Sequence, residues 1–86
     1  MHEASLMNDL MTQVLKLAHD GQAGRVVALT VRLGALSHMS PEHFREHYDI
    51  AARGTIAAGA EIEAIVETDI RSPGAADVRL EAIEIE

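Results

Sequence analysis

The first quarter of the chain repeats apolar residues at helical spacing, and this pattern restricts the fold more than any other feature. It predicts a helix from Ala4 to about Asp20, ended by Gly21 and Gly24. Such a helix must bury its apolar stripe against another element. The stripe consists of Leu6, Leu10, Val14 and Leu17, widened by Met7, Met11 and Ala18.

Three later segments alternate in the manner of strands, at about 25–35, 60–70 and 77–86. In the first, one face is Val27, Leu29, Val31 and Leu33, and the opposite face is Val26, Ala28, Thr30 and Arg32. In the second, Ile62, Ala64 and Val66 are expected to point inward, and Glu61, Glu63 and Glu67 outward into solvent. The last changes phase from Val78, Leu80 and Ala82 to Ile83 and Ile85, which predicts a bulge near residues 82–83 or an exposed edge.

A second helix is expected to begin at Ser40-Pro41, with serine as N-cap and proline in the first helical position. It runs to about Arg53 and ends at Gly54. Its apolar stripe includes Phe44 and Tyr48, the only aromatic residues besides histidine.

The predicted order is therefore helix, strand, helix, strand, strand. One α+β domain covering residues 1–86 follows, with both helices on one face of a small three-stranded sheet. The last two strands are expected to form a hairpin across a turn at residues 71–76.

Composition removes several classes of function. The net charge of −7 argues against binding to nucleic acid, and no basic amphipathic helix is available for a membrane surface. The chain has no cysteine, hence no disulfide and no thiolate metal site. It has neither a long apolar run nor a signal-peptide pattern, so a cytoplasmic location is expected.

The first three residues, Met1-His2-Glu3, combine a free amine, backbone amides, an imidazole and a carboxylate. Nitrogen-rich square-planar sites suit Ni(II) or Cu(II). A histidine near a terminus with no role is the plainer interpretation of this stretch.

A second group of candidate ligands is His38, His43 and His47. His43 and His47 are four residues apart on one helical face, a spacing that can clamp a metal. The string from His43 to His47 also fits the H-x-x-E-H pattern of a zinc peptidase class, with Glu46 as its glutamate. Of the three interpretations of these histidines, a solvated or half-buried helix face with no metal is favoured. Accessory metal binding comes second, and a peptidase comes last.

Four stretches together resemble one known family. They are Met1-His2-Glu3-Ala4-Ser5-Leu6, then Leu33-Gly34-Ala35-Leu36-Ser37 with Pro41-Glu42, then the segment from Arg53-Gly54-Thr55 to Ala60-Glu61-Ile62, and the final Ile83-Glu84-Ile85-Glu86. In order and spacing they are similar to the HypA/HybF family of hydrogenase nickel-incorporation proteins.

This resemblance implies a non-enzymatic nickel metallochaperone that serves a [NiFe]-hydrogenase or a similar nickel enzyme. Its Ni(II) ligands are the Met1 amine, the backbone nitrogens of His2 and Glu3 and the His2 imidazole, with the Glu3 side chain tuning the site. Implied partners are a maturation GTPase and the hydrogenase large subunit. Members also carry a zinc-binding insert with two Cys-x-x-Cys pairs, which residues 71–76 replace here, so no zinc is expected. His38, His43 and His47 have no family role.

Two alternatives stay open beside this interpretation. The first is a metal-independent protein–protein adaptor in metalloenzyme maturation, which docks through the acidic strand face or the second helix. The second is an oligomeric module, such as a homodimer, that pairs through the open edge of its last strand.

Overall fold

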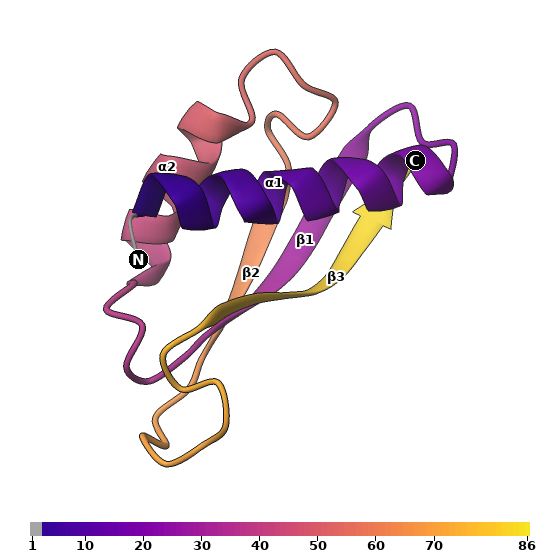
Figure 1. Ribbon diagram of the computed structural model, residues 1–86. Coiled ribbons are helices and arrows are strands. Elements are labelled where there is room, and N and C mark those ends of the chain that lie inside the picture. Colours follow the sequence, from indigo (N-terminus) through magenta and orange to yellow (C-terminus); the bar gives the residue numbers. More distant parts are fainter. Residues whose placement is uncertain (1–2) are drawn as a thin grey trace.

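The computed structural model describes residues 3–86, with side chains described from Ser5 onward. Its elements are α1 (Glu3–Asp20), β1 (Val26–Leu33), α2 (Pro41–Ala51), β2 (Glu61–Val66) and β3 (Val78–Ile85). The predicted α+β class and element order are confirmed. Figure 1 shows α1 lying across the sheet, with α2 beside its first turns. No helix within residues 3–86 is long and apolar enough to cross a membrane.

The sheet order is β2-β1-β3, which makes β1 the central strand. β1 pairs parallel with β2 and antiparallel with β3. The predicted hairpin between the last two strands is therefore wrong. Parallel neighbours need a crossover connection, and α2 supplies it between β1 and β2. The chain must then pass the end of β1 to reach the other side of the sheet.

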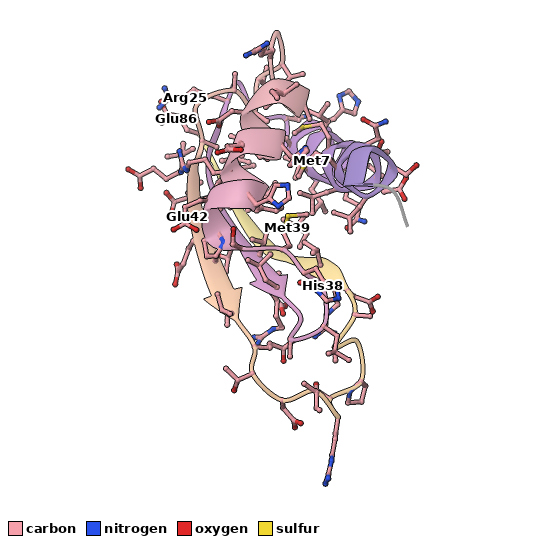
Figure 2. The ribbon with its side chains drawn as sticks, turned by 90° about the vertical axis from the view of Figure 1, so that its left-hand side faces the viewer. Met7, Arg25, His38, Met39, Glu42 and Glu86 are labelled. Atoms are coloured by element: carbon pink, nitrogen blue, oxygen red, sulfur yellow. The ribbon has the colours of Figure 1, made fainter. Side chains whose placement is uncertain are left out.

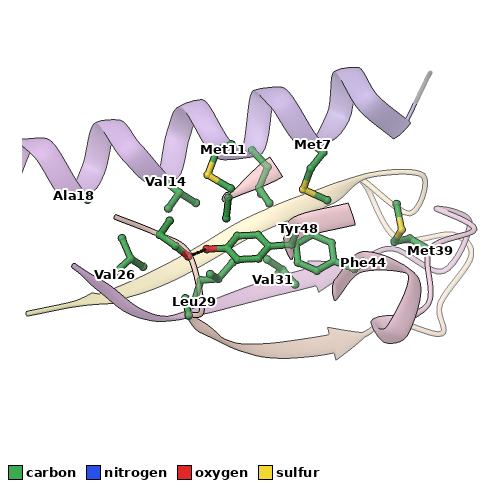
Figure 3. Packing of buried hydrophobic residues seen from close by; sticks show 14 of the residues in the cluster. Met7, Met11, Val14, Ala18, Val26, Leu29, Val31, Met39, Phe44 and Tyr48 are labelled. Carbon is green, nitrogen blue, oxygen red and sulfur yellow. Dashed lines mark hydrogen bonds between the residues drawn. The ribbon is translucent and has the colours of Figure 1, made fainter. Parts of the chain in front are cut away.

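One hydrophobic core joins both helices to the inner face of β1 (Figure 3). The stripe of α1 is rotated relative to the prediction, because Leu17 is 48% exposed and Leu6 is only half-buried. Met7 and Met11, expected at its margin, lie in the core instead. The fully buried side chains with the largest volume are Tyr48, Phe44, Leu10, Leu29, Leu33, Val14, Val26 and Val31.

Two bulges adjust which strand residues face the core. The pairing of β1 with β3 shifts between Val26 and Ala28, so Val26 is buried and Val27, predicted to be inward, is only partly covered. A second shift pairs Thr30 with Ala82 and Val31 with Leu80. The bulge predicted for the last strand is thus present, one residue earlier than expected, at Glu81.

The edge strand β2 is less buried than predicted. Ile62 and Ala64 are half-buried and pack against the core, but Val66 is 55% exposed. An edge strand has a neighbouring strand on one side only, so its last residue gains little cover.

The predicted start of α2 is confirmed in detail. The Ser40 hydroxyl accepts a hydrogen bond from the His43 backbone N–H at 3.1 Å, and Pro41 occupies the first helical turn. The helix ends at Ala51 with Ala52 as its cap, two residues before the predicted end. Gly54, with φ of +75°, follows within the next turn.

The connection from β2 to β3 is fastened to the end of β1 at Gly34. The Gly34 N–H donates to the Asp77 carbonyl at 2.9 Å, and the Leu36 N–H donates to the Ala75 carbonyl at 2.7 Å. A Cβ on Gly34 would lie 2.2 Å from the Ala75 carbonyl oxygen. Only glycine lets these two backbone segments approach so closely.

We expect Gly34→Ala to lower the free energy of unfolding by about 3 kcal/mol, because overpacking against backbone cannot be relieved by a side-chain rotation. Urea unfolding followed by circular dichroism measures this loss. Gly24→Ala is the matched control, since its Cβ would meet its nearest neighbour, the Glu86 carbonyl oxygen, at 3.8 Å. Equal losses in both variants would contradict the assigned role of Gly34.

Candidate metal centre at the start of α1

The start of α1 is the part of the predicted nickel site that the structure describes. Glu3 is the first residue of this helix. The first four backbone N–H groups of an α-helix have no carbonyl partner within the helix. The Glu3 amide is therefore a nitrogen whose use as a ligand breaks no bond of the helix. The predicted ligands Met1 and His2, and the Glu3 side chain, lie outside the described residues.

The first two turns of α1 are held by buried side chains. Met7 and Leu10 are each 2% exposed and belong to the same core cluster as Met39 and Phe44. In Figure 2, Met39 lies between Met7 and His38, below α2. The helix is thus fixed to the body of the protein about one turn after its described start.

Two of the three candidate histidines lie together. The rings of His43 and His47, on α2, have centroids 4.7 Å apart and planes inclined by 42°. His38 lies on the loop before α2, where its φ of +57° is a left-handed conformation that histidine adopts more readily than most residues. Between residues 3 and 86 no three histidine or carboxylate side chains form a group arranged for a metal ion. A pair, rather than a triad, is what the fold assembles.

A groove of about 500 Å³ opens beside this end of the molecule. Leu6 and Asp9 of α1 form one wall, Leu36 and His38 of the loop another, and Asp77 contributes from the start of β3. Leu36 is 45% exposed. The lining of the groove therefore combines apolar side chains with the acidic residues Asp9 and Asp77.

On the sheet face away from the helices, an ion network replaces part of the acidic row predicted to be in solvent. Glu61 and Glu63 are exposed as expected, but the Glu67 side chain is only 17% exposed. Its carboxylate lies 3.9 Å from the Arg32 guanidinium and 3.6 Å from that of Arg79. Glu67 therefore belongs to the structure of the sheet, and it does not offer a free charge to a partner.

The same network extends to the bulge residue Glu81. Arg32 donates a hydrogen bond to the Glu81 carboxylate, and this bond lowers the pKa of Glu81 and raises the pKa of Arg32. The charge of Arg32 also lowers the pKa of Glu81, and the charge of Glu81 also raises the pKa of Arg32, whereas desolvation shifts both pKa values the opposite way. The bulge thus places the Glu81 carboxylate beside Arg32, the only charged side chain of β1.

The segment between α2 and β2 secures α2 against the sheet. The Tyr48 hydroxyl, at the centre of the core, donates to the Ala57 carbonyl at 2.8 Å (Figure 3). Thr55 Oγ1 donates to the Ala52 carbonyl at 2.7 Å and accepts from the Ala57 N–H. The Ile56 carbonyl accepts from the Val26 N–H at the start of β1. One short turn therefore connects the end of a helix, a buried tyrosine and the central strand.

Comparison with known proteins decides the family. Residues 1–72 match the model of the family described as "Hydrogenase/urease nickel incorporation, metallochaperone, hypA". The chain belongs to this family. The match contains the Met1-His2-Glu3 start, both helices and the turn between α2 and β2.

Individual relatives agree with the family match. A hydrogenase maturation factor HypA of Archaeoglobus fulgidus is 40% identical over 72 residues, which cover 83% of this chain and 66% of the relative. That of Methylocella silvestris is 40% identical over 63 residues, which cover 73% of this chain and 56% of the relative. The chain therefore spans less than two thirds of the length of these curated relatives.

A solved structure shows the same fold. The solution structure of the Ni metallochaperone HypA from Helicobacter pylori superposes with a TM-score of 0.78 at 17% identity. The superposition covers 99% of this chain and 97% of the other. At this identity the comparison supports the shared fold alone.

Sequence reasoning missed the positions that fix the site's surroundings. The predicted strand 25–35 includes Gly34, whereas β1 ends at Leu33, and a glycine within a strand pattern is a signal of close backbone approach. The partnership of Tyr48 with Ala57 had no sequence signal, since any buried tyrosine needs a partner but the pattern does not name it.

We expect Tyr48→Phe to lower the free energy of unfolding by about 1 kcal/mol, because the buried Ala57 carbonyl loses the hydroxyl donor at 2.8 Å and keeps the more distant Ala60 N–H at 3.4 Å. Burial raises the pKa of Tyr48 to about 12, with a smaller effect from the charge of Asp49. The stability that the protonated Tyr48 gives to the folded state is complete below pH 10, where the tyrosine of the unfolded chain is still protonated. This stability is lost as the pH rises toward about 12.

Urea unfolding from pH 8 to pH 11.5 measures both effects. The native protein should lose stability above about pH 10 more steeply than Tyr48→Phe, because the unfolded state alone releases the phenolic proton there. Equal slopes for the two proteins would show that other groups cause the alkaline loss.

Proposed function

We propose that this chain binds one Ni(II) ion at its N-terminus and delivers it during maturation of a [NiFe]-hydrogenase or a similar nickel enzyme. The observation that carries the proposal is the family match over residues 1–72, which includes the Met1-His2-Glu3 start. The proposed donors are the Met1 amine, the amide nitrogens of His2 and Glu3 and the His2 imidazole. Four nitrogen donors suit the square-planar preference of Ni(II).

The position of Glu3 supports this donor set. An amide nitrogen becomes a ligand only after it loses its proton, and the Glu3 amide, as the first of α1, donates to no helical carbonyl. Two deprotonated amides neutralise the charge of Ni(II), and the Glu3 carboxylate makes the complex anionic. The N-terminal end of a helix stabilises negative charge, so the macrodipole of α1 favours the loaded state.

The remaining assignments follow from the same proposal. The protein is a carrier and not an enzyme, acts in the cytoplasm, and transfers nickel to a maturation GTPase or to the hydrogenase large subunit. No zinc ion is needed, because the 86 residues contain no cysteine for the two Cys-x-x-Cys pairs of family members. The chain acts as one domain over residues 1–86, with the turn at 71–76 in place of the insert.

A Ni(II) titration of untagged protein that retains Met1 tests the site. We expect one equivalent of Ni(II) with the visible absorption of a square-planar complex, and its loss in His2→Ala. His19→Ala is the control, since His19 is exposed in the last turn of α1 and should not affect binding. Square-planar nickel absorption that persists in His2→Ala would place the nickel site elsewhere on the chain, whereas a native protein that binds no nickel would favour the metal-independent adaptor.

The pH dependence of this binding is a separate prediction. Affinity should rise steeply from pH 6 to pH 9, with release of about two protons per ion from the amides in addition to those of the amine and imidazole. Calorimetry in buffers of different ionisation enthalpy counts the released protons. A site made of imidazoles alone would lose its pH dependence above about pH 7.5, where histidine is neutral.

A further inference from the structure

His43 and His47 on α2 are candidate ligands that the proposed set of terminal donors does not include. We propose that this pair is a two-imidazole site for a divalent metal ion of the zinc, nickel and copper class. The two rings lie on one face of α2, with centroids 4.7 Å apart. Both side chains are half-buried, so packing restricts their motion.

The spacing of the rings fits a shared ion. With metal–nitrogen bonds of about 2.0–2.1 Å, two imidazoles bound to one tetrahedral or square-planar ion have centroids roughly 4.5–5.2 Å apart. The observed 4.7 Å falls within this range, and the inclination of 42° keeps the rings from stacking face to face. The separation of the two rings therefore matches that of two imidazoles bound to one ion.

The charge around the pair favours a cation. Glu42 and Glu46 precede His43 and His47 in the helix, and Asp49 follows within the next turn. Arg45 is the one basic residue of α2, and the chain as a whole carries a net charge of −7. Such a field raises the local concentration of cations.

The site lies close to the start of α1. The two helices contact each other, and Figures 1 and 2 both show α2 beside the first turns of α1. This role rests on the proposed nickel function. The pair binds an ion temporarily, before the ion moves to the terminal ligands or after it leaves them. With two imidazole ligands, it holds an ion more weakly than a closed four-ligand site.

Zinc separates this pair from the terminal site, because Zn(II) prefers tetrahedral imidazole coordination over square-planar amide coordination. Calorimetric titration of the untagged protein with Zn(II) at pH 7.5 is expected to show one equivalent bound. His43→Gln and His47→Gln should each weaken it at least about tenfold, and the double variant little further, because two ligands bind one ion as a unit. The Ser40 cap survives these changes, since it uses the backbone N–H of residue 43.

The matched control is His19→Gln/His38→Asn, which removes two exposed histidines and keeps a residue that tolerates the left-handed backbone at position 38. Its zinc affinity should stay within about twofold of the native value. The proposal is wrong if the control loses as much affinity as the α2 variants, if the two single losses simply add, or if the native protein binds no zinc.

The nickel proposal can be tested independently of the zinc titration. His2→Ala should leave zinc binding at His43 and His47 intact while it removes the square-planar nickel absorption. Loss of zinc binding in His2→Ala would contradict a separate pair. If the double α2 variant loses the square-planar nickel absorption, His43 and His47 belong to the nickel site itself and do not form a second site.

Discussion

The burial of one strand, β1, is the constraint on which the rest of the structure depends. Val26, Leu29, Val31 and Leu33 are at most 1% exposed, and both edges of this strand are paired. β1 is covered on one face and paired along both edges, with a parallel strand on one side and an antiparallel strand on the other. β2 arrives in parallel through α2, and β3 arrives antiparallel after passing the end of β1. The close approach at Gly34 and the long connection from β2 to β3 follow from that route.

The turn between α2 and β2 shows why a family-specific motif need not be a ligand site. Gly54-Thr55-Ile56-Ala57-Ala58-Gly59 is among the stretches that carry the family resemblance, yet the structure explains it through packing. Gly54 and Gly59 adopt positive φ. Ala57 is fully buried, and its carbonyl accepts a hydrogen bond from the Tyr48 hydroxyl. In a core with almost no aromatic side chains, this bond fixes the position of the helix that stands beside the start of α1.

The nickel proposal and the α2 pair use the two helices in different ways. At α1 the backbone itself matters, because the first amide of a helix has no partner within the helix. At α2 the periodicity matters, because residues four apart share one face and bring two imidazoles to metal-chelating distance. The core anchors both helices, α1 through Met7 and α2 through Phe44.

The sequence by itself determined the local structure: the two helices, the Ser40 cap, the three strands and the bulge near residue 82 all follow from periodicity and cap chemistry. The resemblance to the family rests on four sequence stretches, among them the opening Met1-His2-Glu3. Tertiary structure alone decided the strand order, the burial of Val26 in place of Val27, the exposure of Leu17 and the pairing of Glu67 with Arg32 and Arg79. The physical reason is that periodicity names the faces of an element, whereas the neighbour of each face depends on how segments distant in the chain share one core.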